Sequence, residues 1–270
     1  MTHKYYNIDC DGVLKPYTPA SEKRPFDSEA VRGIGLLTEM GYKSAIVSGK
    51  NAQYLLDVAH MSGLHDDFYL IGENGAVVTD SKGKRLYVAS RDGYHELKEI
   101  LLNKFIRENV DGWKRFEWNE GVGYVMEEEK EATFTLLVKS EDGLLPKFIR
   151  YVANATQQVI KDKGLPFQLA YNITSPCSGY VDITPKNVNK ATGLMVVSEY
   201  LGIKPEEMRA IGDSKNDLPM LKFVGYPRAV GNADKDVKKV VEKKGGYIAR
   251  NPYGKGVLEI AMYEKALFSS

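Results

Sequence analysis

Along the first third of the chain, short apolar runs alternate with segments in which apolar residues recur every three or four positions. Short apolar runs at residues 5–8, 44–47 and 68–71 are typical of buried strands. Between these runs, residues 28–40 and 55–63 place apolar side chains three or four positions apart, which is the spacing of a helix with one apolar face. The order strand, helix, strand, helix, strand predicts parallel strands joined by right-handed crossovers.

The pattern changes after residue 75. Residues 76–79 and 85–89 flank the stretch SKGK, whose turn-forming residues predict a β-hairpin. Alternating and helical segments then follow one another and predict an α+β insert with an antiparallel sheet. The predicted helices of this insert are 94–108 and 144–161, and its predicted strands are 122–127, 133–139, 167–171 and 180–183.

The α/β order resumes after the insert. A helix is predicted over residues 190–201 and a strand over 208–211. We therefore predict an α/β fold in which a Rossmann-like parallel-sheet core carries an inserted α+β cap. The predicted limits are 1–84 for the first core segment, 85–183 for the cap and 184–270 for the second core segment.

The composition is that of a soluble globular protein with room for two domains. Of the 270 residues, 43% are hydrophobic and 27% are charged, which excludes a disordered or fibrous chain. The 37 Lys and Arg residues nearly balance the 36 Asp and Glu residues, so no overall field would attract nucleic acid or an anionic membrane. The charge run at 127–131 is interpreted as a solvated turn.

No apolar run near the N-terminus resembles a signal peptide, and no run has the length of a membrane span. We expect a cytoplasmic protein with neither a nucleic-acid nor a membrane partner. Its two cysteines, Cys10 and Cys177, form no metal-type pair and should stay reduced. The oligomeric state is not indicated by the sequence.

Two carboxylates stand one residue apart at the end of the first strand, in the stretch IDCDGV. On an extended backbone Asp9 and Asp11 point to the same side, while Cys10 points to the other and is expected to pack. A metal ion or a shared proton would relieve the repulsion between the carboxylates. A strand that ends in an ordinary Asp-Gly turn explains the same residues without chemistry.

A second acidic pair follows the strand at 208–211, in the stretch IGDSKND. The carboxylates of Asp213 and Asp217 are four residues apart, and oxygen ligands of this kind suit Mg²⁺. Alternatively, Asp217 or Asn216 caps a helix over residues 218–223, which leaves Asp213 unexplained.

Phosphate-binding candidates occur at two helix starts. Ser48 and Gly49 lie between a strand and a helix, where free N–H groups and the helix dipole favour an anion; Ser48 as an ordinary N-cap is the alternative. Lys190 in the first turn of a helix opposes the dipole unless an anion binds there; a solvated Lys190, or Lys186 in its place, is the alternative. These loops, like those of the two acidic pairs, lie at the C-terminal ends of predicted strands or at helix starts, and ligands of open parallel sheets bind at that edge of the sheet.

In this order, DCDGV, VSGKN, Lys190 in PKNVNKATGL, and GDSKNDLPML resemble the four motifs of haloacid dehalogenase superfamily phosphatases. The stretches GENGA and VGNADKDVK are similar to the Cof-type and sucrose-phosphatase-like branch, which includes archaeal phosphoglycolate phosphatases. The resemblance covers the whole discontinuous core, whereas the insert matches only in position and approximate content. Two departures are Cys10, where an aliphatic residue is more usual, and a longer loop at 15–24.

The resemblance implies a Mg²⁺-dependent hydrolase that acts on a small phosphorylated metabolite, a sugar phosphate or a phosphoglycolate-like compound, through an aspartyl-phosphate. Asp9 would be the nucleophile and Asp11 the general acid and base. The implied metal site consists of the Asp9 carboxylate, the Asp11 carbonyl, Asp213 and, beside or behind the metal, Asp217. The implied phosphoryl-binding groups are Ser48, Gly49, Lys190 and Asn216.

Two other functions share parts of this pattern. A regulatory phospho-acceptor module needs an acidic cluster, but it does not need Asp11 or an insert of this size. A phosphotransferase or mutase would use the same chemistry and pass the phosphoryl group to a sugar. The sequence does not indicate the substrate. The candidate specificity residues of the cap, all of which core packing explains equally well, are Trp113, Trp118, Tyr124, Lys139 and Tyr180.

Overall fold

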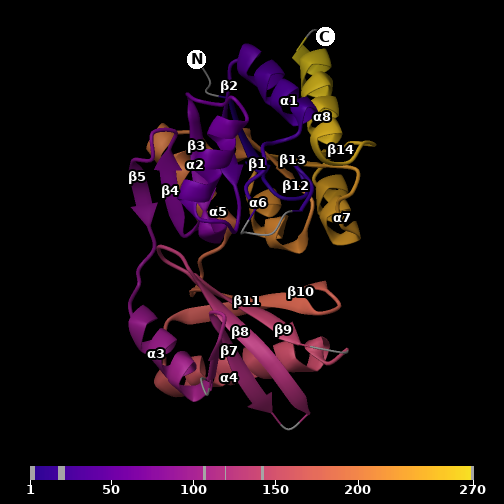
Figure 1. The fold of residues 1–270 in the computed structure, drawn as a ribbon. Coiled ribbons are helices and arrows are strands. Elements are labelled where there is room, and N and C mark those ends of the chain that lie inside the picture. The colour runs from indigo at the N-terminus through magenta and orange to yellow at the C-terminus, as the bar shows by residue number, and fades with distance from the viewer. Residues whose placement is uncertain (1–3, 18–21, 106–107, 119, 141–142, 269–270) are drawn as a thin grey trace. The chain divides into compact units, whose positions relative to one another are not determined.

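The computed structural model describes residues 4–17, 22–105, 108–118, 120–140 and 143–268 (Figure 1). The chain divides into two compact units. The core unit consists of Met1–Val88 and Val188–Ser270, and the insert unit is Ala89–Asn187. The limits at 84/85 and 183/184 stay predictions of domain boundaries. Among the described residues, no helix combines the length and the apolar character that crossing a membrane requires.

The core unit contains an eight-stranded sheet in the order β14-β13-β12-β1-β2-β3-β4-β5. Strands β14 to β3 are parallel, and β4 and β5 form the predicted hairpin, antiparallel at one edge. The strands are β1 Lys4–Asp9, β2 Tyr42–Val47, β3 Phe68–Gly72, β4 Val77–Asp80, β5 Arg85–Val88, β12 Met208–Gly212, β13 Tyr226–Ala229 and β14 Tyr247–Ile248.

Helices cover both faces of this sheet, which explains why its central strands are apolar on both sides. Tyr6 and Ile8 of β1 pack with the helices of one face, whereas Tyr5 packs with those of the other. The first group is α1 Ser28–Glu39, α2 Ala52–Met61 and α8 Tyr253–Phe268; the second is α5 Lys190–Leu201, α6 Leu218–Phe223 and α7 Lys235–Lys243. The described part of the core also contains the 3₁₀ turns η1 Glu73–Gly75, η2 Pro205–Glu207 and η3 Lys215–Asp217.

The insert unit is an α+β module with an antiparallel sheet, as predicted. Its strand order is β10-β11-β9-β8-β7-β6. The strands are β6 Glu108–Val110, β7 Trp113–Trp118, β8 Gly121–Glu129, β9 Phe134–Ser140, β10 Phe167–Ser175 and β11 Ser178–Pro185. Phe148 of helix α4 Leu145–Lys163 and Leu97 of helix α3 Tyr94–Phe105 share one apolar cluster with Val138 of β9. Both helices therefore cover the same face of the sheet.

Two sequence predictions within the insert were wrong. The helix predicted over 94–108 does not extend to Glu108, which begins β6; residues 106–107 lie outside the described chain. Asp111 and Gly112 have positive φ angles of 50° and 80° and form the two-residue turn between β6 and β7, an Asp-Gly hairpin signal that the helical spacing obscured.

The charge run at 127–131 is not a solvated turn over its whole length. Strand β8 continues through Glu129, and Glu128 lies opposite Thr135 of β9. Backbone pairing with a central strand stabilises this end of β8 even though its side chains are acidic. Strand order, which is a tertiary property, decided the conformation here.

Candidate active site

Three carboxylates from two distant segments of the chain meet at the carboxyl edge of the core sheet. Asp9 is the last residue of β1, and Asp213 follows the last residue of β12. These strands are parallel neighbours, so their ends coincide. Asp9, Asp213 and Asp217 are buried, and each offers an oxygen within 4.8 Å of the other two. The structure thus brings together three of the four residues that the sequence predicted as metal ligands.

Lys190 lies against this acidic cluster. Its Nζ is 2.5 Å from Oδ1 of Asp9 and 2.6 Å from Oδ1 of Asp217, and its side chain is only 1% exposed. Lys190 is the first residue of α5, and the Asn189 side chain caps that helix by accepting a hydrogen bond from the Ala191 N–H at 2.9 Å. The helix start therefore determines where the ammonium group lies.

Asp217 holds the turn after β12 in place. Its Oδ2 accepts hydrogen bonds from the N–H groups of Asp213 at 2.9 Å and Ser214 at 3.0 Å. The side chain does not cap α6, so the capping alternative for this residue was wrong. Gly212 permits the approach, because a Cβ there would lie 2.6 Å from the Asp217 Cβ.

Asp213 has one occupied and one orphaned oxygen. Oδ2 accepts a hydrogen bond from the Tyr17 hydroxyl at 2.9 Å, whereas the buried Oδ1 has no hydrogen-bond partner within the described part of the chain. Gly12 passes close by with φ +91°, and a Cβ on it would lie 2.2 Å from Oδ2. The Asn232 amide donates to the Gly12 carbonyl at 2.9 Å and holds this loop. A buried carboxylate oxygen without a donor suits a cation.

The charges of the cluster do not balance, since three carboxylates face one ammonium. Burial and the charge of Asp217 raise the pKa of Asp213 to about 7. Burial, followed by the charge of Asp217, also raises the pKa of Asp9. Burial alone would lower the pKa of Lys190, but Asp217 and Asp9 raise it above its usual value. An all-oxygen donor set with excess negative charge and an orphaned oxygen fits a hard divalent cation such as Mg²⁺.

The Asp11 carboxylate lies outside that cluster and is paired differently. Its Oδ1 is 3.4 Å from the Nζ of Lys15. Lys15 is buried and donates a hydrogen bond to the hydroxyl of Tyr54 on α2 at 3.0 Å. Burial would lower the pKa of Lys15, but the Tyr54 hydrogen bond and the Asp11 charge raise it above the usual value. Sequence reasoning missed Lys15 and Tyr17, because single residues in a loop carry no periodic signal.

Three of the four predicted phosphoryl-binding residues lie in the loops after β2 and β12, and the fourth, Lys190, begins α5. Ser48 is buried, and its Oγ accepts a hydrogen bond from the Lys50 N–H at 3.1 Å. The N-cap of α2 is Asn51, so Ser48 as an N-cap was wrong. Gly49 is half-buried beside Asn74.

Asn216 is exposed in the turn after β12. Its Oδ1 accepts a hydrogen bond from the Ser214 hydroxyl at 2.6 Å. This contact orients the amide side chain without burying it. The phosphoryl-binding roles of Ser48, Gly49, Lys190 and Asn216 stay predictions.

Cys10 points away from these groups, as expected from the strand geometry. It is fully buried in the apolar cluster that contains Ile8 and Tyr54. Burial and the nearby Asp11 carboxylate raise the pKa of its thiol, which keeps the sulfur protonated and unreactive. Packing accounts for this residue.

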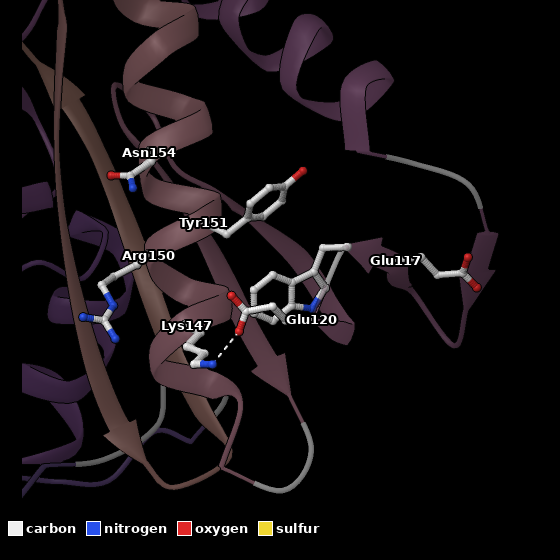
Figure 2. Close-up of a pocket in the computed structure, with 7 residues that line it drawn as sticks. Glu117, Glu120, Lys147, Arg150, Tyr151 and Asn154 are labelled. Atoms are coloured by element: carbon white, nitrogen blue, oxygen red, sulfur yellow. Dashed lines mark ion pairs between the residues drawn. The ribbon is translucent and has the colours of Figure 1, made fainter.

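The insert unit contains a pocket of about 520 Å³ between the end of β7 and helix α4. Figure 2 shows Lys147, Arg150 and Tyr151 projecting from α4, with Lys147 paired to Glu120 at 2.6 Å. Trp118 also lines the pocket and packs against Tyr151, with ring centroids 5.7 Å apart. Lys147 thus pairs with a carboxylate of its own unit, whereas Nε of Arg150 donates a hydrogen bond to the Pro146 carbonyl at 2.8 Å. Both contacts are exposed, unlike the buried cluster of the core.

The other predicted specificity residues of the insert are found on β7, β8, β9 and β11. The Nζ of Lys139 lies 4.1 Å from the ring centroid of Trp113. Lys139 pairs with Tyr124 across β8 and β9, and Tyr180 accepts a hydrogen bond from Asn172 at 3.4 Å. Their roles in specificity stay predictions.

Comparison with known proteins agrees with these features. The family described as haloacid dehalogenase-like hydrolase matches residues 8–259. A phosphoglycolate phosphatase of Methanothrix thermoacetophila is 40% identical over 260 residues, covering 96% of each chain. Phosphoglycolate phosphatase 1 of Saccharolobus solfataricus is 29% identical over 259 residues, covering 93% of this chain and 91% of that one.

A solved structure shares the fold. The sucrose-phosphatase from Synechocystis, determined in complex with sucrose and phosphate, matches with a TM-score of 0.61 at 17% identity. The match covers 97% of this chain and 98% of the other. The α/β core and the antiparallel insert therefore form one known arrangement of domains along a chain.

Proposed function

Because the chain belongs to the haloacid dehalogenase-like hydrolase family and is a phosphatase within it, we propose that it hydrolyses small phosphomonoesters through a phosphorylated Asp9. The observation that carries the proposal is the buried cluster of Asp9, Asp213 and Asp217, closed by Lys190 at the carboxyl edge of the sheet. Lys190 favours the ionised form of Asp9 against the effect of burial, and an ionised carboxylate is a nucleophile.

Two proton transfers at Asp11 complete the cycle. In the first step an Asp9 oxygen forms a bond to phosphorus, the bond from phosphorus to the ester oxygen breaks, and the Asp11 carboxyl gives its proton to that oxygen. In the second step the Asp11 carboxylate takes a proton from water, whose oxygen attacks phosphorus and releases Asp9. Inorganic phosphate leaves, and both aspartates return to their initial states.

Asp9, Asp213 and the Asp11 carbonyl are the groups we assign to Mg²⁺, with Asp217 beside them. When bound, the ion would offset the repulsion between a carboxylate and an anionic phosphate ester. The orphaned Oδ1 of Asp213 and the excess of carboxylates over cations support this assignment.

Ser48, the Gly49 N–H, Asn216 and Lys190 are assigned to the phosphoryl oxygens. Three of these groups lie in loops that follow strands of the core sheet, and Lys190 begins a helix at the same edge. Donors placed there would stabilise the charge that develops on those oxygens during transfer.

We assign the substrate to the phosphoglycolate or sugar-phosphate class. The names of the phosphoglycolate phosphatases among the relatives support phosphoglycolate as the type of substrate. The match to the sucrose-phosphatase shows that this fold also occurs in an enzyme named for a sugar phosphate. The balanced net charge of +1 supports a small metabolite over nucleic acid. We assign the selectivity among such phosphate esters to the insert. A cytoplasmic location stays a prediction.

The proposal is tested with Asp9→Asn. Incubation with Mg²⁺ and a panel of phosphomonoesters should release inorganic phosphate from the wild type, and the variant should fold but release none, because an amide is a poor nucleophile. Circular dichroism serves as the control for folding. Phosphate release by Asp9→Asn at the wild-type rate would reject the nucleophile, and recovery of all phosphate on a second sugar would indicate a mutase.

A further inference from the structure

Lys15 is a buried cation that the proposed reaction does not use. Its side chain is 2% exposed, and its neighbours Val13 and Leu14 in the same loop belong to an apolar cluster of the core. Removing an ammonium from water is unfavourable unless partners replace the lost solvation. Partners among the described residues include a carboxylate oxygen of Asp11 at 3.4 Å and the Tyr54 hydroxyl at 3.0 Å. The buried Lys15 is therefore in direct contact with Asp11, the proposed general acid and base.

The backbone holds Lys15 in a tight turn. The Gly12 N–H donates to the Lys15 carbonyl at 2.8 Å, and the Leu14 N–H donates to the Cys10 carbonyl at 2.9 Å. These bonds fix the backbone from Cys10 to Lys15, and with it the positions from which the Asp11 and Lys15 side chains project. A cation held in place beside a carboxylate restricts the orientation of that carboxylate.

Tyr54 holds the ammonium group of Lys15 in place beside Asp11. Its hydroxyl accepts from Nζ of Lys15 and donates to the Glu22 carbonyl at 3.0 Å. Its backbone N–H donates to the Asn51 side chain at 2.7 Å, so Tyr54 belongs to the capped first turn of α2. A chain of contacts thus runs from a helix of the scaffold through Tyr54 and Lys15 to Asp11.

We propose that Lys15, held by Tyr54, is a positioning residue that keeps the Asp11 carboxyl in line for proton transfer to the leaving oxygen. The proposal rests on the proposed function, because it gives Asp11 the role of general acid. Lys15 touches neither the phosphorus nor the leaving group in this scheme. Its contribution appears only in the step in which the proton moves from Asp11 to the ester oxygen as the phosphorus–oxygen bond breaks.

The chemistry of the leaving group separates this role from a structural one. A p-nitrophenolate leaves as a stable anion without a proton, whereas the alkoxide of phosphoglycolate needs one as it departs. The ratio kcat/KM covers every step up to departure of the leaving group and excludes hydrolysis of the phosphorylated Asp9. Loss of general-acid positioning should therefore lower kcat/KM for the alkyl ester alone, while loss of folded protein lowers both values equally.

The experiment compares Lys15→Met and Tyr54→Phe with the wild type on phosphoglycolate and p-nitrophenyl phosphate. Lys15→Met should lower kcat/KM for phosphoglycolate by roughly tenfold to a hundredfold, which is part of the roughly hundredfold to ten-thousandfold that general-acid catalysis contributes. It should lower kcat/KM for p-nitrophenyl phosphate by less than about threefold, because that leaving group needs no proton. Tyr54→Phe keeps the ring and removes only the hydroxyl, so it should change the ratio in the same direction by a smaller factor.

Lys23→Met is the matched control, because it removes an exposed ion pair with Asp57 between the same loop and the same helix. It should leave the ratio of the two kcat/KM values unchanged. If Lys15→Met does not fold, Tyr54→Phe alone decides. Folded variants with the wild-type ratio, alongside an inactive Asp9→Asn, would overturn the role of Lys15 and leave the proposed function standing; an active Asp9→Asn would overturn the proposed function itself.

Discussion

Single atoms determine the environment of Asp213. One of its oxygens is hydrogen-bonded by Tyr17 and the other is buried without a partner among the described residues. Gly12 makes this arrangement possible, because only a residue without Cβ fits beside Oδ2 at this backbone conformation. The metal-binding capacity that we propose for Asp213 therefore depends on a glycine that carries no functional group.

Gly12→Ala should weaken Mg²⁺ binding. The added Cβ would lie 2.2 Å from Oδ2 of Asp213 and must displace that carboxylate. We expect the Kd for Mg²⁺ to rise by roughly tenfold to a hundredfold, as for changes in groups that orient a metal ligand. Isothermal titration calorimetry of the metal-free protein measures this directly.

Gly41→Ala is the matched control for Gly12→Ala. Gly41 has a similar φ of +82°, but nothing lies within 4 Å of the position of its Cβ. Both variants carry the cost of a left-handed alanine, about 1–2 kcal/mol. Equal Kd values for the two variants would show that the carboxylate of Asp213 is not involved.

At the scale of elements, the start of α5 decides where Lys190 lies. The turn η1 packs against it, with Glu73 and Asn74 at φ angles of 54° and 56°. Gly75 follows at φ +97°, and a Cβ there would lie 2.1 Å from the Asn189 carbonyl oxygen. The stretch GENGA therefore serves as a support for the helix that presents the ammonium group.

Gly75→Ala should reduce activity through displacement of that helix. We expect a loss in kcat of roughly a hundredfold, which is the order of effect of a 1 Å misplacement near the chemistry. Steady-state kinetics with p-nitrophenyl phosphate measures it. Gly83→Ala is the control, since Gly83 has φ +79° but the nearest atom to its Cβ position is Leu56 Cδ2 at 3.7 Å. A fully active Gly75→Ala would contradict the supporting role of η1.

At the scale of the whole molecule, Glu264 of α8 joins four adjacent strands of the core sheet. It accepts hydrogen bonds from the Tyr6 hydroxyl of β1 at 3.0 Å and the Tyr42 hydroxyl of β2 at 3.4 Å. Its ion pairs are with Arg209 of β12 at 3.2 Å and Arg228 of β13 at 2.7 Å. This carboxylate is buried, so its loss would leave the Arg228 charge uncompensated.

Glu264→Gln should lower the free energy of unfolding by about 3–5 kcal/mol at pH 7, the usual cost of breaking a buried ion pair. Burial would raise the pKa of Glu264, but Arg228 and Arg209 lower it below the ordinary value of 4.5. Since the pKa is lower in the folded state than in the unfolded state, the contribution is complete above pH 4.5 and is lost as the pH falls through the folded value.

Urea unfolding of the wild type and Glu264→Gln at several pH values checks this prediction. The difference between their free energies of unfolding should shrink below pH 4.5. Asp57→Asn, which breaks an exposed ion pair with Lys23, is the control and should cost at most about 1 kcal/mol at any pH. A pH-independent difference for Glu264→Gln would exclude the ionised carboxylate as its cause.

Local patterns in the sequence determined the alternating elements around Asp9 and Asp213, because periods of two and 3.6 residues reflect burial within each element. Parallel neighbours must end at one edge of a sheet, so the meeting of these two carboxylates could also be predicted. The continuation of β8 to Glu129 could not be predicted, since pairing with β9 rather than local composition sets it. The β6–β7 hairpin was missed although its Asp-Gly turn is a local signal, because the helical spacing before it was extended too far.

Tertiary structure alone decided which groups surround the catalytic candidates. Lys15 meets Tyr54 across 39 positions of sequence, and Tyr17 meets Asp213 across 196. No periodicity encodes such contacts, because they depend on how a loop folds over the end of a sheet. The sequence by itself determined the type of chemistry through its carboxylates and Lys190, whereas packing decided which carboxylate is paired, which oxygen is orphaned and which cation lies beside Asp11.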